Sequence, residues 1–240
     1  MSKAIVVHEE SSAVKSRLAE LGVPDEQMLR DAVAEGEVTR ASFHKNVPGM
    51  AVGCAKWGTI VGGVRTRLVP HGWISSGRGH LEETLNPETK VSIVVSTGDD
   101  VTGVNGDADP KTKYPKGMAT KEAIKQNNAQ LDLWSRLYPG DPAYMPGFKP
   151  DISPAVTAND AGTAADSDGI MTWVLLVVRT DDEIRCELSL PYGIGIDNVV
   201  ESWAERIILK PIPLDGSSKV EVVPVEPTPE IDVLVTRRKL

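Results

Sequence analysis

Long apolar runs, aromatic side chains and cysteines are all scarce in this chain of 240 residues. The sequence contains no run of 18 apolar residues, so we expect no membrane-spanning helix. The first residues turn polar too early for a secretory signal. The two cysteines, Cys54 and Cys186, lie far apart in apolar surroundings, which indicates buried thiols rather than a disulfide or metal ligands. These absences predict a cytoplasmic protein that does not contact a membrane.

Positive charge is also in deficit. The chain has 26 Lys and Arg against 34 Asp and Glu, which gives a net charge of −8. Proteins that bind nucleic acid over their whole surface are normally basic, so only a local basic groove could serve such a partner here. Aromatic residues make up 5% of the chain, which leaves few side chains for stacking on bases.

The N-terminal part of the sequence shows helical periodicity. Apolar residues recur every three or four positions within residues 1–70 and predict an N-terminal helical part, preceded by a short strand or arm at 4–7. Gly36 is the expected end signal of the second helix. Residues 75–80 are expected to form a loop. The helices are expected at residues 11–21, 25–34 and 48–68.

The second part, residues 88–210, is predicted to hold the sheet. The apolar, β-branched run at 91–96 predicts a buried strand, and a helix is expected from Ala119 to about Leu137. Residues 171–190 predict a hairpin whose first arm is apolar enough to be buried on both faces. Asp197 is the expected N-cap of a closing helix that ends at Arg206. The predicted main core includes Trp173, Leu175, Leu188 and Trp203.

Together these elements predict one α+β domain over residues 1–210, in which an N-terminal helical part is followed by a mostly antiparallel sheet with helices packed on one face. Residues 211–240 are rich in proline and predict an extended C-terminal arm. Residues 139–169 form a proline-containing stretch that is longer than most loops in compact domains.

A cluster of lysines surrounds the expected start of the helix at 119. Lys113, Lys116 and Lys121 lie near Gly117, and Thr120 is a candidate N-cap. The first N–H groups of a helix are free donors and its dipole favours an anion, so these residues predict a phosphate or carboxylate site. The spacing is not that of a P-loop. The alternative is a turn whose lysines are solvated.

Two aspartates follow the strand at 91–96. Asp99 and Asp100, together with Glu187 on the hairpin, predict a loose metal site, with Mg²⁺ as the candidate cofactor. A metal-dependent nuclease would place a lysine two residues after the glutamate, but Ser189 stands there. The alternatives are a loop whose aspartates bond their own backbone and a structural pair of Glu187 with Arg185.

Four segments, VSIVVSTGDDVTG, TKYPKGMAT, RCELSLP and ESWAERIIL, together resemble an uncharacterised family of bacterial and phage-borne hypothetical proteins. The resemblance covers roughly residues 25–212. It implies a mobile-element or prophage context and assigns no functional residues.

Two functions stay open from the sequence. In the first, the protein binds or acts on a phosphate-bearing ligand, either a nucleotide or a nucleic-acid strand, at residues 97–121. In the second, it is a non-enzymatic interaction protein, held by protein partners in a larger assembly through residues 139–169 and the C-terminal arm. Whether the protein is an enzyme is not decided by the sequence.

Overall fold

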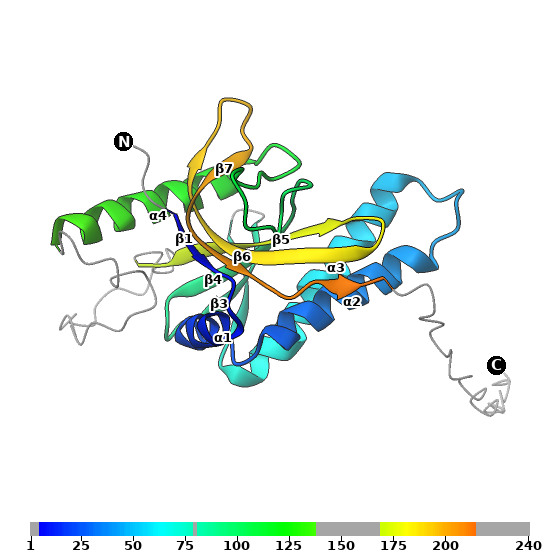
Figure 1. The fold of residues 1–240 in the computed structure, drawn as a ribbon, viewed down its shortest axis with the longest axis horizontal. Helices are drawn as coiled ribbons and strands as arrows, with labels where there is room; N and C mark the ends of the chain where they lie inside the picture. The colour runs from blue at the N-terminus through cyan, green and yellow to red at the C-terminus, as the bar shows by residue number, and fades with distance from the viewer. Residues whose placement is uncertain (1–4, 79–80, 138–168, 215–240) are drawn as a thin grey trace, which may run out of the picture.

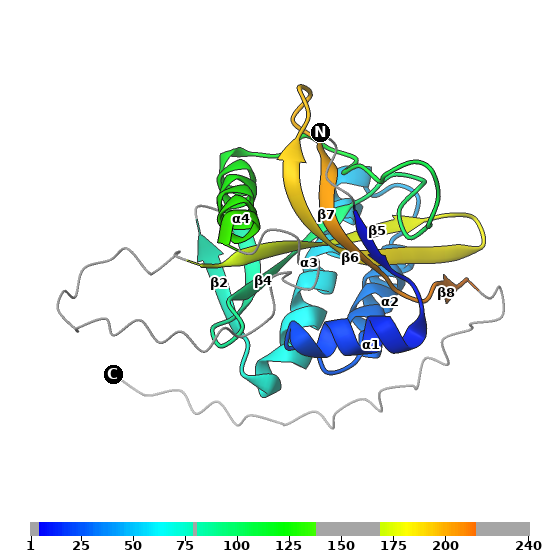
Figure 2. The same cartoon turned by 60° about the vertical axis from the view of Figure 1, so that its left-hand side comes forward.

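The computed structural model describes residues 5–78, 81–137 and 169–214, which form a mixed 8-stranded sheet with helices on both faces (Figure 1 and Figure 2). The strands are β1 (Val6–His8), β2 (Ile74–Arg78), β3 (Leu81–Asn86), β4 (Val91–Thr97), β5 (Met171–Arg179), β6 (Glu183–Ile194), β7 (Val200–Ile208) and β8 (Ile212–Pro213). Their order is β1-β7-β6-β5-β4-β3-β2, and β8 pairs with β6 outside this order.

Four α-helices accompany the sheet in the described residues. They are α1 (Ser11–Glu20), α2 (Glu26–Ser42), α3 (Gly49–Leu68) and α4 (Met118–Leu137), and a short 3-10 turn, η1 (Val69–His71), follows α3. Helices α1, α2 and α3 lie on one side of the sheet and α4 on the other (Figure 2). None of the helices that the structure describes is long and apolar enough to cross a membrane.

The expected combination of helices and sheet is confirmed, but the sheet is mixed rather than mostly antiparallel. Strand β1 runs parallel to β7, and β4 runs parallel to β5. Parallel neighbours need a crossover connection, and α4 lies in the connection between β4 and β5. Because this crossover helix packs opposite α1–α3, helices cover both faces of the sheet and not one.

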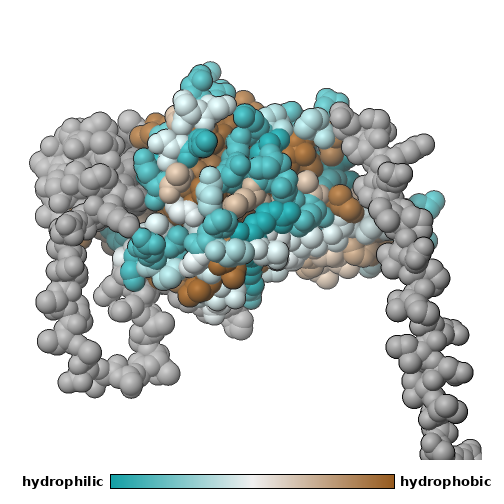
Figure 3. Space-filling model, turned by 90° about the horizontal axis from the view of Figure 1, so that it is seen from below, coloured by the Kyte–Doolittle hydropathy of each residue, from teal (hydrophilic) through white to brown (hydrophobic). Residues whose placement is uncertain are grey.

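Strand β5 divides its side chains between two cores. Trp173 and Leu175 join the core under α1–α3, whereas Val174 and Leu176 join a smaller core under α4. All four are at most 2% exposed, so the expectation that this arm is buried on both faces is confirmed. Seen from the side of α1–α3, hydrophilic and hydrophobic side chains are interspersed on the outer surface (Figure 3), since the apolar sides of these helices face the sheet.

The helix expected at 197–206 is wrong, because this segment forms β7. Asp197 accepts a hydrogen bond from the N–H of Val199 (3.3 Å), as an N-cap would, but this contact belongs to the turn between β6 and β7. Register shifts in the pairing of β6 with β7 let Val200 and Trp203, which are three positions apart, both face the α4 side. A bulged strand thus reproduces apolar spacing that resembles a helix.

Three other expectations differ from the structure. Cys54 of α3 is exposed rather than buried, whereas Cys186 is buried as expected. The loop expected at 75–80 contains β2, which pairs with β3. Helix α2 continues to Ser42, because Gly36 packs against α3 instead of ending the helix: a Cβ at Gly36 would lie 2.3 Å from Ile60 Cγ1. The C-terminal arm beyond residue 214 and almost all of residues 139–169 lie outside the described residues.

Replacing Trp203 with alanine should lower the free energy of unfolding by about 3–5 kcal/mol. The indole is 0% exposed, and its Nε1 donates a hydrogen bond to the carbonyl of Pro110 (2.6 Å). Urea-induced unfolding followed by circular dichroism measures the loss. The matched control is Trp57→Ala, whose indole is 41% exposed and should cost less than half as much. Equal losses in the two variants would contradict the packing described above.

Candidate functional site

The predicted site lies on residues 98–117, which we call the β4–α4 loop. The loop folds back on the end of β4, where the N–H of Lys113 donates to the carbonyl of Thr97 (2.9 Å). It also meets the start of β7: the N–H of Thr112 donates to the carbonyl of Val200 (3.0 Å), and Thr112 Oγ1 accepts from the N–H of Val200 (3.0 Å). The path of the loop is therefore fixed by hydrogen bonds to two strands.

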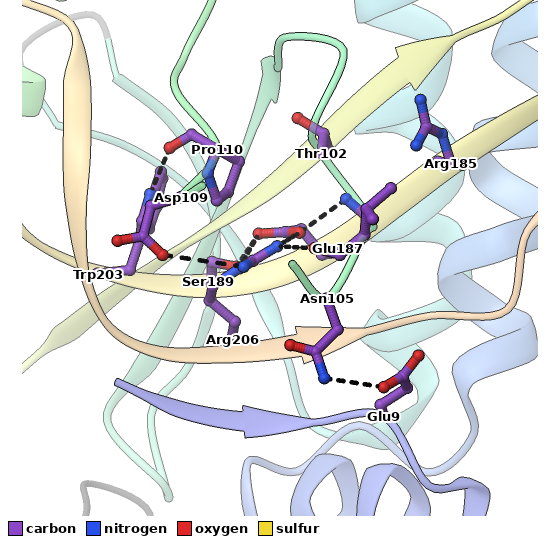
Figure 4. A network of polar contacts seen from close by, with 12 residues as sticks. Glu9, Thr102, Asn105, Asp109, Pro110, Arg185, Glu187, Ser189, Trp203 and Arg206 are labelled. Carbon is purple, nitrogen blue, oxygen red and sulfur yellow. Dashed lines mark hydrogen bonds and ion pairs between the residues drawn. The ribbon is translucent and has the colours of Figure 1, made fainter. Parts of the chain in front are cut away.

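A buried ion pair lies beneath this loop (Figure 4). Arg206 of β7 donates from Nε and Nη2 to the two carboxylate oxygens of Glu187 on β6, at 3.1 and 2.7 Å. The side chains are 1% and 0% exposed. Glu187 Oε2 also accepts from the N–H of Gly103 (2.8 Å), and Arg206 Nη2 donates to the carbonyl of Val104 (2.9 Å). The pair thus binds the loop backbone with both of its members.

Two carboxylates of the predicted metal site, those of Glu187 and Asp99, accept hydrogen bonds from the backbone of this loop. Both oxygens of Glu187 are occupied by Arg206, Gly103 and Ser189, whose Oγ donates at 2.7 Å. Asp99 accepts from the N–H of Lys111 (3.0 Å) within the loop. Among the residues that the structure describes, no three His, Cys, Asp or Glu are grouped to hold a metal. The prediction of a metal at Asp99, Asp100 and Glu187 therefore gains no support.

Arg206 is the residue of this cluster that sequence reasoning missed. The expected helix placed it at a helix end, and Arg185 was the expected partner of Glu187. In the structure Arg185 donates to the carbonyl of Asp100 (2.7 Å), while Arg206 lies opposite Ser189 in the β6–β7 pairing. The available signal was the polar side of β6: a glutamate facing a buried sheet surface requires a cation near it.

The predicted anion site has three lysines. Of these, Lys116 alone makes a hydrogen bond to a described side chain. It is half-buried, and its Nζ lies 2.6 Å from Ser96 Oγ at the end of β4. Its backbone N–H donates to the carbonyl of Asn198 (2.8 Å). Burial lowers the pKa of the Lys116 ammonium, and no described carboxylate lies within ion-pair distance of it.

The other predicted residues lie around the first turn of α4. Lys113 is exposed, with its Nζ 5.9 Å from the ring centre of Tyr114, and Lys121 is partly exposed. The N–H of Lys121 donates to the carbonyl of Gly117 (3.1 Å), so Gly117 precedes the helix and takes the N-cap place. The expected cap, Thr120, lies instead within the first turn.

A second buried ionic cluster lies on the other face of β7. Glu205 is 0% exposed and accepts from Arg17 of α1 at 2.5 and 2.9 Å, and its Oε1 lies 2.9 Å from His8 Nε2 on β1. Burial alone raises the pKa of Glu205, but the hydrogen bonds from His8 and Arg17 bring it below its ordinary value of 4.5. This cluster attaches α1 and the edge strand β1 to the sheet.

Part of the chain is similar to a known protein. No family model matches the chain, and no solved structure matches it. Over 105 residues, or 43% of the chain, the sequence is 31% identical to a polyribonucleotide nucleotidyltransferase of Aquifex aeolicus (strain VF5). The matched stretch is 13% of that protein, so the chain is similar to a small part of it.

Arg206→Met should lower the free energy of unfolding by about 3–5 kcal/mol, because it leaves the buried Glu187 carboxylate without its cation. Urea unfolding of the wild type and the variant measures the difference. Arg67→Met is the control, since its ion pair with Glu35 is partly exposed, at 23% and 50%; the expected loss there is within about 1 kcal/mol. A loss at Arg206 no larger than at Arg67 would show that the pair is not important for stability.

The stability of the wild type should fall with pH through the titration of Glu205. Its folded pKa lies below 4.5, so the ionised carboxylate contributes fully above that pH, and the contribution is lost as the pH falls through the folded pKa. Glu205→Gln has no such titration. The difference in melting temperature between the two proteins should therefore shrink as the pH falls below about 4.3, the usual value for a glutamate in an unfolded chain. A difference that stays constant over this range would refute the assignment.

Proposed function

We propose that the protein binds a phosphate-bearing ligand, specifically a single-stranded polyribonucleotide, at the α4 start, which we define as Gly117–Thr120 with Lys113, Lys116 and Lys121. The observation that carries the proposal is the set of three lysines around one helix start, none of which has a carboxylate partner among the described residues. The neighbouring Lys111, by contrast, pairs with Glu201 at 2.8 Å. Cations without an anionic partner are available to an external anion.

The topology supports an anion at this place. Strands β4 and β5 are parallel, and α4 follows β4 in the crossover between them. In sheets with parallel strands, ligands bind outside the carboxyl ends of the strands, where helix N-termini also lie. The contact of Lys116 with Ser96 ties the approach to α4 to the carboxyl end of β4.

The backbone at the helix start is open to a ligand. A Cβ placed on Gly117 would meet nothing within 4 Å, and Met118 is 78% exposed. The first N–H groups of α4 have no acceptor within the helix and carry the positive end of its dipole. A phosphate can therefore approach these donors without displacing a described side chain.

The choice of polyribonucleotide rests on the partial match. The similar protein of Aquifex aeolicus is named for a polyribonucleotide substrate. The net charge of −8 favours a local contact with few phosphates over a broad one. The alternative function, in an assembly, depends on residues 139–169 and the C-terminal arm, which lie almost wholly outside the described residues.

The test is the anisotropy of a labelled single-stranded oligoribonucleotide titrated with protein at several salt concentrations. Lys113→Ala and Lys121→Ala should each weaken binding at all sequences alike. Each should also reduce the slope of log affinity against log salt by about 0.7, the value for one phosphate contact on a single strand. Lys15→Ala, which removes an exposed lysine of α1 on the other side of the sheet, is the control and should change neither quantity.

If the two variants bind with the affinity and salt slope of the wild type, the α4 start is not the binding site. If the wild type itself shows no binding at low salt, the choice of ligand is wrong.

A further inference from the structure

Ser96 and Lys116 make a contact that phosphate binding does not require. Their side chains come from the end of β4 and from the β4–α4 loop, 20 positions apart in sequence. The protonated Nζ of Lys116 donates a hydrogen bond to Ser96 Oγ (2.6 Å), and Ser96 Oγ donates to the carbonyl of Thr97 (3.4 Å). A neutral Nζ at the same place would instead accept the hydroxyl proton of Ser96. Both residues are half-buried, so each is partly desolvated and partly within reach of a small molecule.

The surroundings of Lys116 are those of a lysine that can act as a base. A lysine in a partly apolar site without a carboxylate near it loses its proton more readily than one in water, because burial disfavours the ammonium. The pKa of Lys116 is lowered by burial in this way. The pKa of Lys111 in the same loop is raised, through a hydrogen bond with Glu201. The two lysines thus have opposite tendencies although they are five positions apart.

We propose that Ser96 and Lys116 form a nucleophile–base pair that hydrolyses carboxylic esters. Pairs of serine and lysine replace the serine–histidine–aspartate arrangement in some acyl-transfer enzymes. The inference does not rest on polyribonucleotide binding, because it uses the neutral amine of Lys116 and the hydroxyl of Ser96. The ammonium form of Lys116, together with Lys113 and Lys121, is the form that binds phosphate.

The reaction balances with water as the only co-reactant. The neutral Nζ of Lys116 takes the hydroxyl proton of Ser96 while Oγ bonds to the carbonyl carbon of the ester. The resulting ammonium then gives this proton to the leaving alcohol as the ester C–O bond breaks. Water, deprotonated by the same Nζ, attacks the acyl-serine, and release of the carboxylic acid restores both side chains.

The start of α4 supplies donors for the oxyanion formed in this reaction. Only Gly117 separates Lys116 from Met118, where the helix begins. Gly117 has open space at its Cβ position, so the carbonyl group can approach the backbone there. N–H groups without an intrahelical acceptor are the kind of group that stabilises a developing oxyanion.

The test uses a fluorophosphonate probe, which reacts covalently with activated serines. Mass spectrometry of the labelled wild-type chain should place the adduct on Ser96. Ser96→Ala should abolish labelling, and Lys116→Met, which keeps most of the length of the side chain but removes the amine, should slow it roughly 100-fold. Ser75→Ala, at an exposed serine of β2, and Lys15→Met, at an exposed lysine of α1, are the matched controls and should label as the wild type does.

The labelling rate of the unmodified chain adds a measurement that does not depend on the folding of any variant. It should rise with pH as Lys116 loses its proton, with a midpoint below 10.5, the ordinary value for lysine. Hydrolysis of p-nitrophenyl acetate should follow the same profile. Absence of labelling at Ser96, equal rates in the wild type and Lys116→Met, or a rate that does not change with pH would each overturn the proposal.

Discussion

The buried pair of Arg206 and Glu187 is the interaction on which the arrangement of the site depends. Helix α4 covers only part of its side of the sheet, over the apolar residues Val174 and Leu176. Next to it the β4–α4 loop takes the place of a helix and brings polar backbone to the sheet. A loop needs hydrogen-bonding groups beneath it, because unpaired backbone polar groups are costly to bury.

Strands β6 and β7 supply these hydrogen-bonding groups as two charged side chains, Glu187 and Arg206. Two charges removed from water are tolerated only where they are paired and their remaining hydrogen-bonding capacity is used. Glu187 meets this condition through Gly103 and Ser189, and Arg206 through Val104. Loop and pair therefore stabilise each other. The fixed loop carries Lys116 to the end of β4, where it meets Ser96.

Strand β7 is held from both of its faces. Arg206 points to the side of α4, and the preceding residue, Glu205, points to the side of α1, where it binds Arg17. Helix α4 is attached by a further buried polar group: Asn127 donates to the carbonyls of Thr172 and Pro191 (2.9 Å each) and accepts from the N–H of Thr172 (2.9 Å). Buried and fully bonded groups of this kind specify one arrangement of the elements.

Periodicity predicted the elements in which the spacing of apolar residues stays the same along the whole element. The strand at 91–96, the hairpin at 171–190 and the helix from 119 all keep such a spacing. The segment 197–206 does not, because a bulge in its pairing shifts the side-chain alternation, so a strand was mistaken for a helix. Strands β2 and β3 were missed because they are short and polar, with ISSGR and LEETLN as their sequences.

The candidate site was only partly predictable, for a related reason. The lysines around Gly117 could be recognised because they lie close together in the sequence. The contact of Ser96 with Lys116 could not, because it joins residues 20 positions apart through the path of the loop. That path depends on Arg206, which the sequence did not connect with Glu187.

Amide hydrogen exchange in Glu187→Gln tests most directly whether the buried pair holds the loop. The substitution keeps the shape of the side chain but removes the charge that Arg206 needs. The amides of Gly103 and Thr112, which are bonded to Glu187 and Val200 in the wild type, should then exchange faster, while that of Leu175 in β5 keeps its protection. Unchanged protection at Gly103 and Thr112 would show that the loop does not depend on the pair.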